Sequence, residues 1–285
     1  MARLYNRSAS LTIARPTSGE FTLAPLPNAI EISGLSMSFK IEKSLEPGPN
    51  TCEVIVFNLA ENTRAEFQRK PLHVILEAGY DDVTSRLFAG DMRWARSSRE
   101  GPDWQTKILI GDGDRAYRHA RMNRSYGAGV NKKTIVKDLA KSMGLVVPTD
   151  ATSAIQFLTE FGAGASVEGP SADAMTKILG SSGASWSIQD GRLQIQGPSD
   201  VRANEALIIS QDTGMIGTPE YGPPTKPGEA ATMSVKTLLR NEVTAGGKIK
   251  MESAQIEGLF KVQKVSHVGH TRAQDWTTSI EAKPL

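Results

Sequence analysis

The sequence has little cysteine, little net charge and few long apolar stretches. Among its 285 residues there is one cysteine, Cys52, so the chain cannot form an internal disulfide and does not depend on an oxidising compartment. The 33 Lys and Arg nearly balance the 31 Asp and Glu, which argues against the broad basic surface of a non-specific nucleic-acid binder. No apolar run approaches the roughly 18 residues of a membrane helix, and no apolar segment of a secretory signal follows the first arginines.

Signatures of catalysis and of metal binding are also missing. The four histidines are not arranged as H-E-x-x-H or as a zinc set with cysteine, and the sequence lacks G-x-S-x-G. Its Gly-rich pieces lack the lysine and the spacing of a phosphate-binding loop. The paired acids at 81–82 and at 112 and 114 lie in turn-like contexts, where carboxylates are solvated rather than tuned for acid catalysis. We therefore predict no catalytic residue, no metal ligand and no cofactor.

The first third of the chain has the alternation of β-strands. Two alternating runs, at 37–42 and 51–57, flank the turn sequence 46–50, which predicts a hairpin. Short strands that follow at this spacing are typical of an antiparallel barrel or sandwich. The further elements that we expect are a short helix at 61–68, ended by Pro71, and strands at 72–80, 86–94 and 104–110.

The middle of the chain changes to a mixed pattern. Apolar residues recur at helical spacing over 131–143, and Gly144 follows as a stop signal. Ser171 is the expected N-cap of a second short helix that ends at Gly180. After it, a hairpin is predicted across the Asp-Gly turn at 190–191, which pairs Trp186 and Ile188 with Leu193 and Ile195.

The last third returns to β-structure. Residues 214–228 are rich in proline and have no periodicity, so we interpret them as a long connection that is functional or ordered by a partner. The pattern as a whole predicts a mainly β protein with an α+β part: two antiparallel β-barrel or sandwich domains, 1–118 and 198–285, flank a small α+β domain, 119–197. The strands expected in the last part are 233–239, 248–252, 259–267 and 276–282.

One concentration of positive charge interrupts the balanced sequence. Arginines recur every third residue, with Tyr117, His119 and Tyr126 between them, at Arg115, Arg118, Arg121 and Arg124. Such a cluster can contact phosphate groups or an acidic protein partner, and it can equally be a solvated or ion-paired segment between domains. We treat these arginines, and Tyr221 in the proline-rich connection, as candidate partner contacts.

Ordered segments along the chain resemble the hub proteins of phage baseplates. The first domain resembles that family in a strand of the type F-x-I-x-K-S-L, a strand ending in N-L, a short E-x-T-R helix and a strand ending in A-G-Y. Further segments resemble its central and C-terminal domains. The resembling segments are 39–59, 61–64, 76–80 and 88–90, then 134–144 and 185–193, then 212–219, 235–241, 256–262 and 267–276.

This resemblance implies a structural role in a tail of the Mu-like contractile type, related to tailocin and secretion-system spikes. It implies that the two β-domains are similar to tail-tube proteins. Three copies would form a pseudo-sixfold ring that joins a sixfold tail tube, or tube-initiator protein, to a threefold central spike. The expected location is the tail baseplate of a virion assembled in the bacterial cytoplasm. The genome would pass through the ring without specific binding, and we expect no enzymatic activity.

Two other functions remain open from the sequence. One is a hub associated with a wall-degrading enzyme, for which no acid pair or metal set is found. The other is an oligonucleotide-binding β-barrel, which predicts salt-sensitive affinity for single strands through the arginine cluster.

Overall fold

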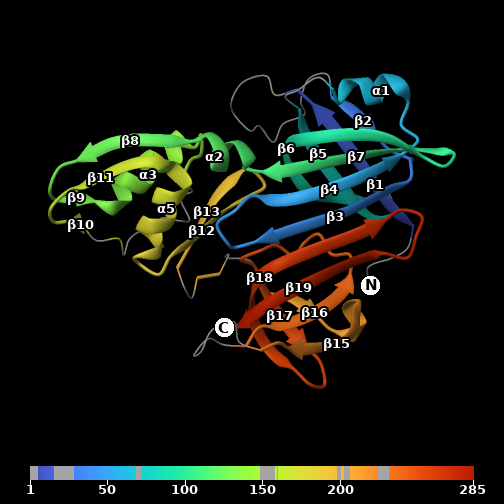
Figure 1. Cartoon of the computed structure of the whole chain (residues 1–285). Coiled ribbons are helices and arrows are strands. Elements are labelled where there is room, and N and C mark those ends of the chain that lie inside the picture. The colour runs from blue at the N-terminus through green and yellow to red at the C-terminus, as the bar shows by residue number, and fades with distance from the viewer. Residues whose placement is uncertain are drawn as a thin grey trace.

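The computed structural model describes residues 6–15, 29–68, 72–81, 83–147, 158, 160–197, 200–201, 206–223 and 231–285. Thirteen strands of this part form one sheet, and three two-stranded sheets lie apart from it (Figure 1). No helix within these ranges is long and apolar enough to cross a membrane.

The described residues from 6 to 112 form a β unit that we call the N-terminal unit. Alternation puts apolar side chains of its strands on one buried face, as for Cys52, Val54 and Val56. Its elements are β1 (Arg7–Ala14), β2 (Ile30–Ile32), β3 (Met37–Ser44), β4 (Asn50–Phe57), α1 (Glu61–Glu66), β5 (His73–Tyr80), β6 (Val83–Glu100) and β7 (Asp103–Asp112). The predicted hairpin of β3 and β4 is confirmed.

The described residues from 114 to 197 form the arm. Helices α3 and α5 bury Ile135, Leu139, Met175 and Leu179 at helical spacing. The elements of the arm are α2 (Asp114–His119), β8 (Arg121–Tyr126), β9 (Val130–Asn131), α3 (Lys132–Ser142), β10 (Glu160–Phe161), β11 (Ala165–Pro170), α5 (Ser171–Gly180), β12 (Ser185–Gln189) and β13 (Arg192–Gln196).

The described residues from 206 to 285 form the C-terminal unit. Here too the alternation holds, since Trp276, Thr278, Ile280 and Ala282 are all buried on one face of a strand. The elements are β14 (Leu207–Ile209), the 3₁₀ turn η1 (Gln211–Thr213), β15 (Met215–Tyr221), β16 (Met233–Leu238), β17 (Lys248–Glu252), β18 (Glu257–His270) and β19 (Trp276–Pro284).

Strand β18 joins the two β units in one sheet. Along one edge it pairs with β19. Along its other edge, residues 257–261 pair with β17 and residues 264–270 pair with β3. A bulge between Val262 and Lys264 marks the change of partner, as expected where a strand bends. The units are therefore connected by backbone hydrogen bonds as well as by the chain.

The strand order is β15-β16-β19-β18-β3-β4-β7-β6-β5-β1-β2, with β17 and β14 branching from β18. All pairs are antiparallel except β14 with β17. The prediction of a mainly β fold with an α+β part is confirmed. The barrel form is not, because the described strands form an open path whose ends, β15 and β2, do not pair with each other.

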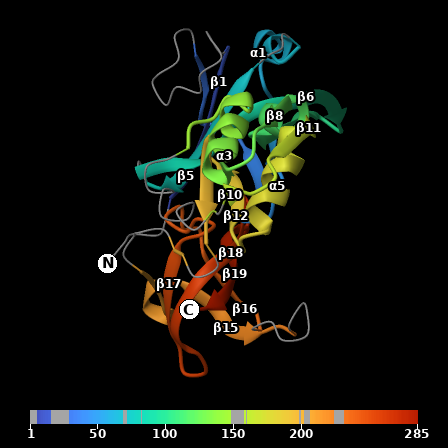
Figure 2. The same cartoon turned by 90° about the vertical axis from the view of Figure 1, so that its left-hand side faces the viewer.

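The described residues form three separate apolar clusters, one in each β unit and one in the arm. Leu239 and Trp276 cross from the C-terminal part into the N-terminal cluster, where the Trp276 ring meets Phe39 edge-on at a centroid distance of 5.4 Å. The arm stands beside the sheet and the C-terminal unit lies beneath the N-terminal unit (Figures 1 and 2). The domain boundaries stay a prediction, since clusters do not locate the ends of domains.

Two local predictions are wrong. Residues 215–221 are the edge strand β15 rather than loop, because a bulge between Ile216 and Glu220 accommodates Pro219; residues 224–228 lie outside the described residues. Ser171 is the first residue of α5 and not its N-cap, which is Pro170. The buried Ser171 hydroxyl instead lies 2.8 Å from the Ser142 hydroxyl of α3.

Candidate functional site

Eight neighbouring strands, from β15 to β6, have their buried apolar side chains on one side of the sheet. Among the described residues, the other side carries no side chain of the apolar clusters. We call this side the open face. Alternation directs Lys40 and Glu42 of β3, and Glu53 of β4, to it, while their neighbours in the strands are buried. Charged side chains from the other strands stand on the same side by register; they are Arg96, Lys107, Lys236, Lys264 and Glu281.

Opposite charges on the open face are paired. Nζ of Lys107 lies 2.8 Å from Glu53, Nζ of Lys40 lies 2.9 Å from Glu42, and Lys264 lies 4.0 Å from Glu281. The hydrogen bond from Lys40 lowers the pKa of Glu42. Exposed pairs of this kind contribute at most about 1 kcal/mol each. Their consequence is a surface without a strong excess of either sign.

The eight-stranded part ends in two edges without a backbone partner among the described residues. Strand β15 pairs with β16 on one side alone. At the other end β6 leaves β5 after Asp91, so residues 94–100 pair with β7 alone. Unpaired edges of this length are ready to pair with another chain.

Large apolar side chains are exposed at both edges. Trp94 of β6 is 38% exposed, and on β15 Ile216 is 41% and Tyr221 is 52% exposed. Trp94 and Ile216 both belong to the open face by register. The β6 edge adds Arg96 and the β15 edge adds Glu220, so the two edges carry opposite charge.

The four predicted arginines are divided between two elements. Arg115 and Arg118 lie on α2, which ends at His119, whereas Arg121 and Arg124 lie on β8; a single helical face is therefore not formed. All four are exposed. Arg118 pairs with Asp114 at 3.2 Å and Arg124 with Asp138 at 2.8 Å.

The remaining predicted contact, Tyr221, lies far from the arginines in the fold, at the end of edge strand β15. Its ring lies 6.5 Å from that of Phe260. No ion pair is found for Arg115 or Arg121 within the described ranges. The residues put forward from the sequence thus form two surfaces, one on the arm and one at the sheet edge.

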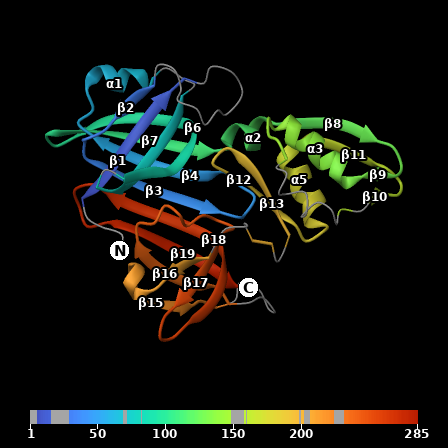
Figure 3. The same cartoon turned by 180° about the vertical axis from the view of Figure 1, so that it is seen from behind.

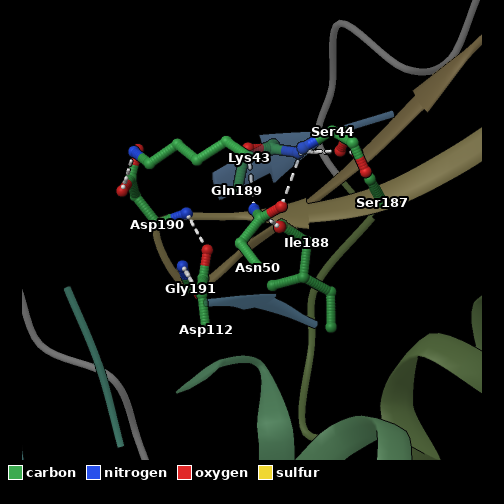
Figure 4. Close-up of polar contacts among 9 residues, drawn as sticks. All are labelled: Lys43, Ser44, Asn50, Asp112, Ser187, Ile188, Gln189, Asp190 and Gly191. Atoms are coloured by element: carbon green, nitrogen blue, oxygen red, sulfur yellow. Dashed lines mark hydrogen bonds and ion pairs between the residues drawn. The ribbon is translucent and has the colours of Figure 1, made fainter. Parts of the chain in front are cut away.

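A buried polar joint, which the sequence patterns do not predict, connects the arm to the N-terminal unit. Figure 4 shows the turn of β12 and β13 against the ends of β3, β4 and β7. The carboxylate of Asp112 accepts hydrogen bonds from the backbone N–H groups of Asp190 and Gly191 at 2.5 and 2.8 Å. Lys43, whose side chain is 5% exposed, donates to Asp190 at 2.8 Å.

Amides complete this joint. Asn50 donates to the Ile188 carbonyl and to the Gln189 side chain, both at 2.9 Å, and accepts from the Ser44 N–H. Gln189 in turn donates to the Ser44 carbonyl at 2.8 Å. Burial, and next to it the Asp190 carboxylate, raise the pKa of Asp112 to about 7. Asp112 is buried at the end of β7, so the expectation of a solvated carboxylate at 112 is wrong, and the Asp-Gly turn is the sequence signal that remains for the joint.

Chemistry of other kinds has little support in the described residues. They contain no group of three or more His, Cys, Asp or Glu side chains that could hold a metal ion. Cys52 is fully buried, and burial raises the pKa of its thiol far above the ordinary value. A buried thiol of this kind is a poor nucleophile.

Comparison with protein families decides the question of membership. The model of the family described as Baseplate hub gp41 matches residues 21–267, most of the chain. The chain belongs to this family. It is a baseplate hub protein, and its structural role in a phage tail follows from that membership. A comparison with curated protein sequences gives no match.

Solved structures share the fold of this hub protein. The tail protein from Neisseria meningitidis MC58 superposes with a TM-score of 0.63 at 11% identity, covering 98% of this chain and 97% of that one. The 43 kDa tail protein of prophage MuSo2 from Shewanella oneidensis superposes with a TM-score of 0.66 at 10% identity, covering 97% of this chain and 98% of that one. The E. coli c3393 protein, a component of the type VI secretion system, superposes with a TM-score of 0.61 at 10% identity, covering 88% of this chain and 73% of that one. At these identities the likeness concerns the fold.

Proposed function

We propose that this baseplate hub protein forms a ring of three copies that joins the tail tube, or a tube-initiator protein, to a central spike. The protein would act through its interfaces and not as an enzyme. Its place would be the baseplate of the virion tail, assembled in the cytoplasm of the bacterial host.

The observation that carries the proposal is the pair of free edges on one continuous sheet. Edge residues 94–100 of one copy and β15 of the next are similar in length, and they carry Arg96 and Glu220, which are opposite in charge. Pairing them would satisfy backbone groups and cover Trp94 and Ile216. Because the two edges differ, the contact is heterologous, and such contacts close into rings when the rotation allows.

In such a ring the open face would line the lumen. Its paired charges, such as Lys107 with Glu53 and Lys40 with Glu42, leave few free cations to bind phosphate. Nucleic-acid affinity grows with the number of phosphates neutralised. We infer that the genome passes this surface without being retained.

Partner proteins would contact the surfaces outside the ring seam. We propose the arginines that lack an ion pair among the described residues, Arg115 and Arg121, as contacts for acidic segments of neighbouring baseplate proteins. Arg118 and Arg124 would contribute less, since each already pairs with an acid of the arm. Tyr221, at the sheet edge, would contact the spike or an adjacent copy.

A substitution in the ring seam, by which we mean the contact between the β6 edge of one copy and β15 of the next, tests the ring. Trp94→Ala should shift the purified chain from trimer to monomer in analytical ultracentrifugation, because buried Trp side chains at interfaces contribute about 2 kcal/mol or more. Trp104→Ala is the matched control: Trp104 has the same 38% exposure but lies on β7, under Arg64. The ring seam is refuted if both variants assemble alike, or if Trp104→Ala alone dissociates.

The alternative functions make different predictions in the same preparation. Turnover of peptidoglycan by the chain would indicate a wall-degrading activity. Salt-sensitive affinity for single-stranded DNA, lost when Arg118 and Arg121 become Ala, would indicate an oligonucleotide-binding module. Neither result is expected from the hub.

A further inference from the structure

Three attachments connect the arm to the β units: the chain itself, the polar joint, and an ion pair at 2.7 Å between Arg93 of β6 and Asp114 of α2, which lies next to the point where the chain enters the arm. The apolar cluster of the arm is separate from both others. The chain enters the arm after Gly113, which has a positive φ of 68°, and leaves it at Gly197. Figures 1 and 3 show β12 and β13 lying between the sheet and the helices of the arm. The hairpin thus bridges the arm and the sheet.

The turn of this hairpin is held by contacts that depend on a few side chains. Asp112 binds two consecutive backbone N–H groups, Lys43 binds Asp190, and Asn50 binds the Ile188 carbonyl. Ile188 packs closely on Gly113, where a Cβ would lie 2.6 Å from its Cδ1. These groups meet within one turn, so losing one weakens the whole contact.

The other end of the hairpin is held more weakly. Gln196 donates to the Gly246 carbonyl at 3.4 Å, and Lys261 donates to the Gly197 carbonyl at 3.4 Å. Beside the joint runs a groove of about 710 Å³ whose lining includes Ser44, Asn50 and Ser185. Solvent that enters this groove can reach the turn and replace its hydrogen bonds when the contact opens.

We propose that Asp112, Lys43 and Asn50 form a latch that sets the position of the arm, and that opening the latch lets the arm swing as a rigid body about Gly113 and Gly197, with the Arg93–Asp114 ion pair beside the first of these hinge points. The arm keeps its own core in the open state, because none of the latch residues belongs to that core. Opening the latch costs little free energy, because the hydrogen bonds that break are replaced by hydrogen bonds to water. Separating an apolar core would cost more, because it would expose apolar surface to water. The proposal does not depend on the ring.

Protonation of Asp112 modulates the latch. The charged and titratable groups around it are Lys43 of β3, Asp190 of the turn and Tyr117 of α2, while Arg93 of β6 and Asp114 of α2 lie against the neighbouring Gly111. Because the pKa of Asp112 is raised in the closed joint and returns to its ordinary value in water, a proton binds the closed form more tightly. Raising the pH through about 7 therefore favours opening.

Double electron–electron resonance tests the latch in the full chain. Spin labels are attached through Glu61→Cys and Asp173→Cys, both exposed, while the buried Cys52 stays unlabelled. Asp112→Ala should broaden the distance distribution and speed hydrogen exchange at the Asp190 and Gly191 amides about tenfold, or about 1.4 kcal/mol. Amides of α3 and α5 should keep their protection. In the unsubstituted latch the distribution should broaden from pH 6 to pH 8, and in Asp112→Asn it should not.

The matched control is Asp138→Ala, which removes a carboxylate whose partners Arg124 and Tyr126 both lie in the arm. It should leave the distance distribution unchanged. Asn50→Ala gives the same test as Asp112→Ala if the latter does not fold. An unchanged distribution in the latch variants, or loss of protection in all three cores together, would overturn the proposal.

Discussion

Gly269 lies where the two β units meet in the sheet, with no room for a side chain, and its substitution is a direct test of the fold. On β18 it pairs with Phe39 of β3, and a Cβ at Gly269 would lie 2.2 Å from Cζ and 2.6 Å from Cε1 of that ring. The ring cannot withdraw easily, since Phe39 is 3% exposed and meets Trp276. Overpacking of this kind costs about 1–3 kcal/mol, so Gly269→Ala should lower the free energy of unfolding by that amount.

A double-mutant cycle isolates this contact. The three atoms nearest to the added Cβ are Cζ, Cε1 and Cε2, which Leu lacks. Phe39→Leu should cost on the order of 1–2 kcal/mol by leaving a cavity, and should tolerate Gly269→Ala with little further loss. Urea unfolding of the four proteins gives the coupling energy. Strict additivity, or a neutral Gly269→Ala, would refute the register of β18 on β3.

Further predictions concern single buried groups. Burial, and next to it Lys43, lower the pKa of His267 to about 3. As the pH falls below the ordinary pKa of histidine, the unfolded chain therefore takes up a proton at this residue before the folded chain does. The neutral buried His267 contributes to stability at pH 7, and about 2 kcal/mol of this contribution is lost by pH 5. The variant His267→Gln can still bind Thr278, so its free energy of unfolding should fall by about 2 kcal/mol less over this pH range. An equal fall in both proteins would contradict a lowered pKa of His267. Cys52 should react with a thiol reagent in denaturant and not in the native protein, as measured by absorbance; rapid native labelling would contradict its burial. Gly113→Ala should destabilise the joint by about 1 kcal/mol or more through its positive φ and its contact with Ile188, seen as faster exchange in β12.

Local patterns in the sequence predicted local structure well. The alternation of Cys52, Val54 and Val56 located β4, and the Asp-Gly turn located the hairpin in which Trp186 pairs with Ile195. Both signals depend on a few neighbouring residues and on the positive φ that the turn requires at Asp190 and Gly191. The resemblance of ordered segments, confirmed by the family match, supplied the structural role.

Long-range pairing could not be predicted in this way. The local sequence of β18 does not show that its pairing partner changes from β17 to β3 at Lys264. Strand register depends on which strands meet in the fold. Lys43 lies on the core side of β3 and is buried against Asp190, although a lysine in an alternating strand is expected outside. The sequence does not predict the edge strand β15, because Pro219 argues against a strand, and it does not predict β1 either.

The number of copies in the assembled particle tests the central claim most directly. Native mass spectrometry of the purified chain, alone and with its spike protein, measures this number against the 30.7 kDa mass of one chain. The account predicts three copies per particle. A chain that stays monomeric even with its spike would contradict it.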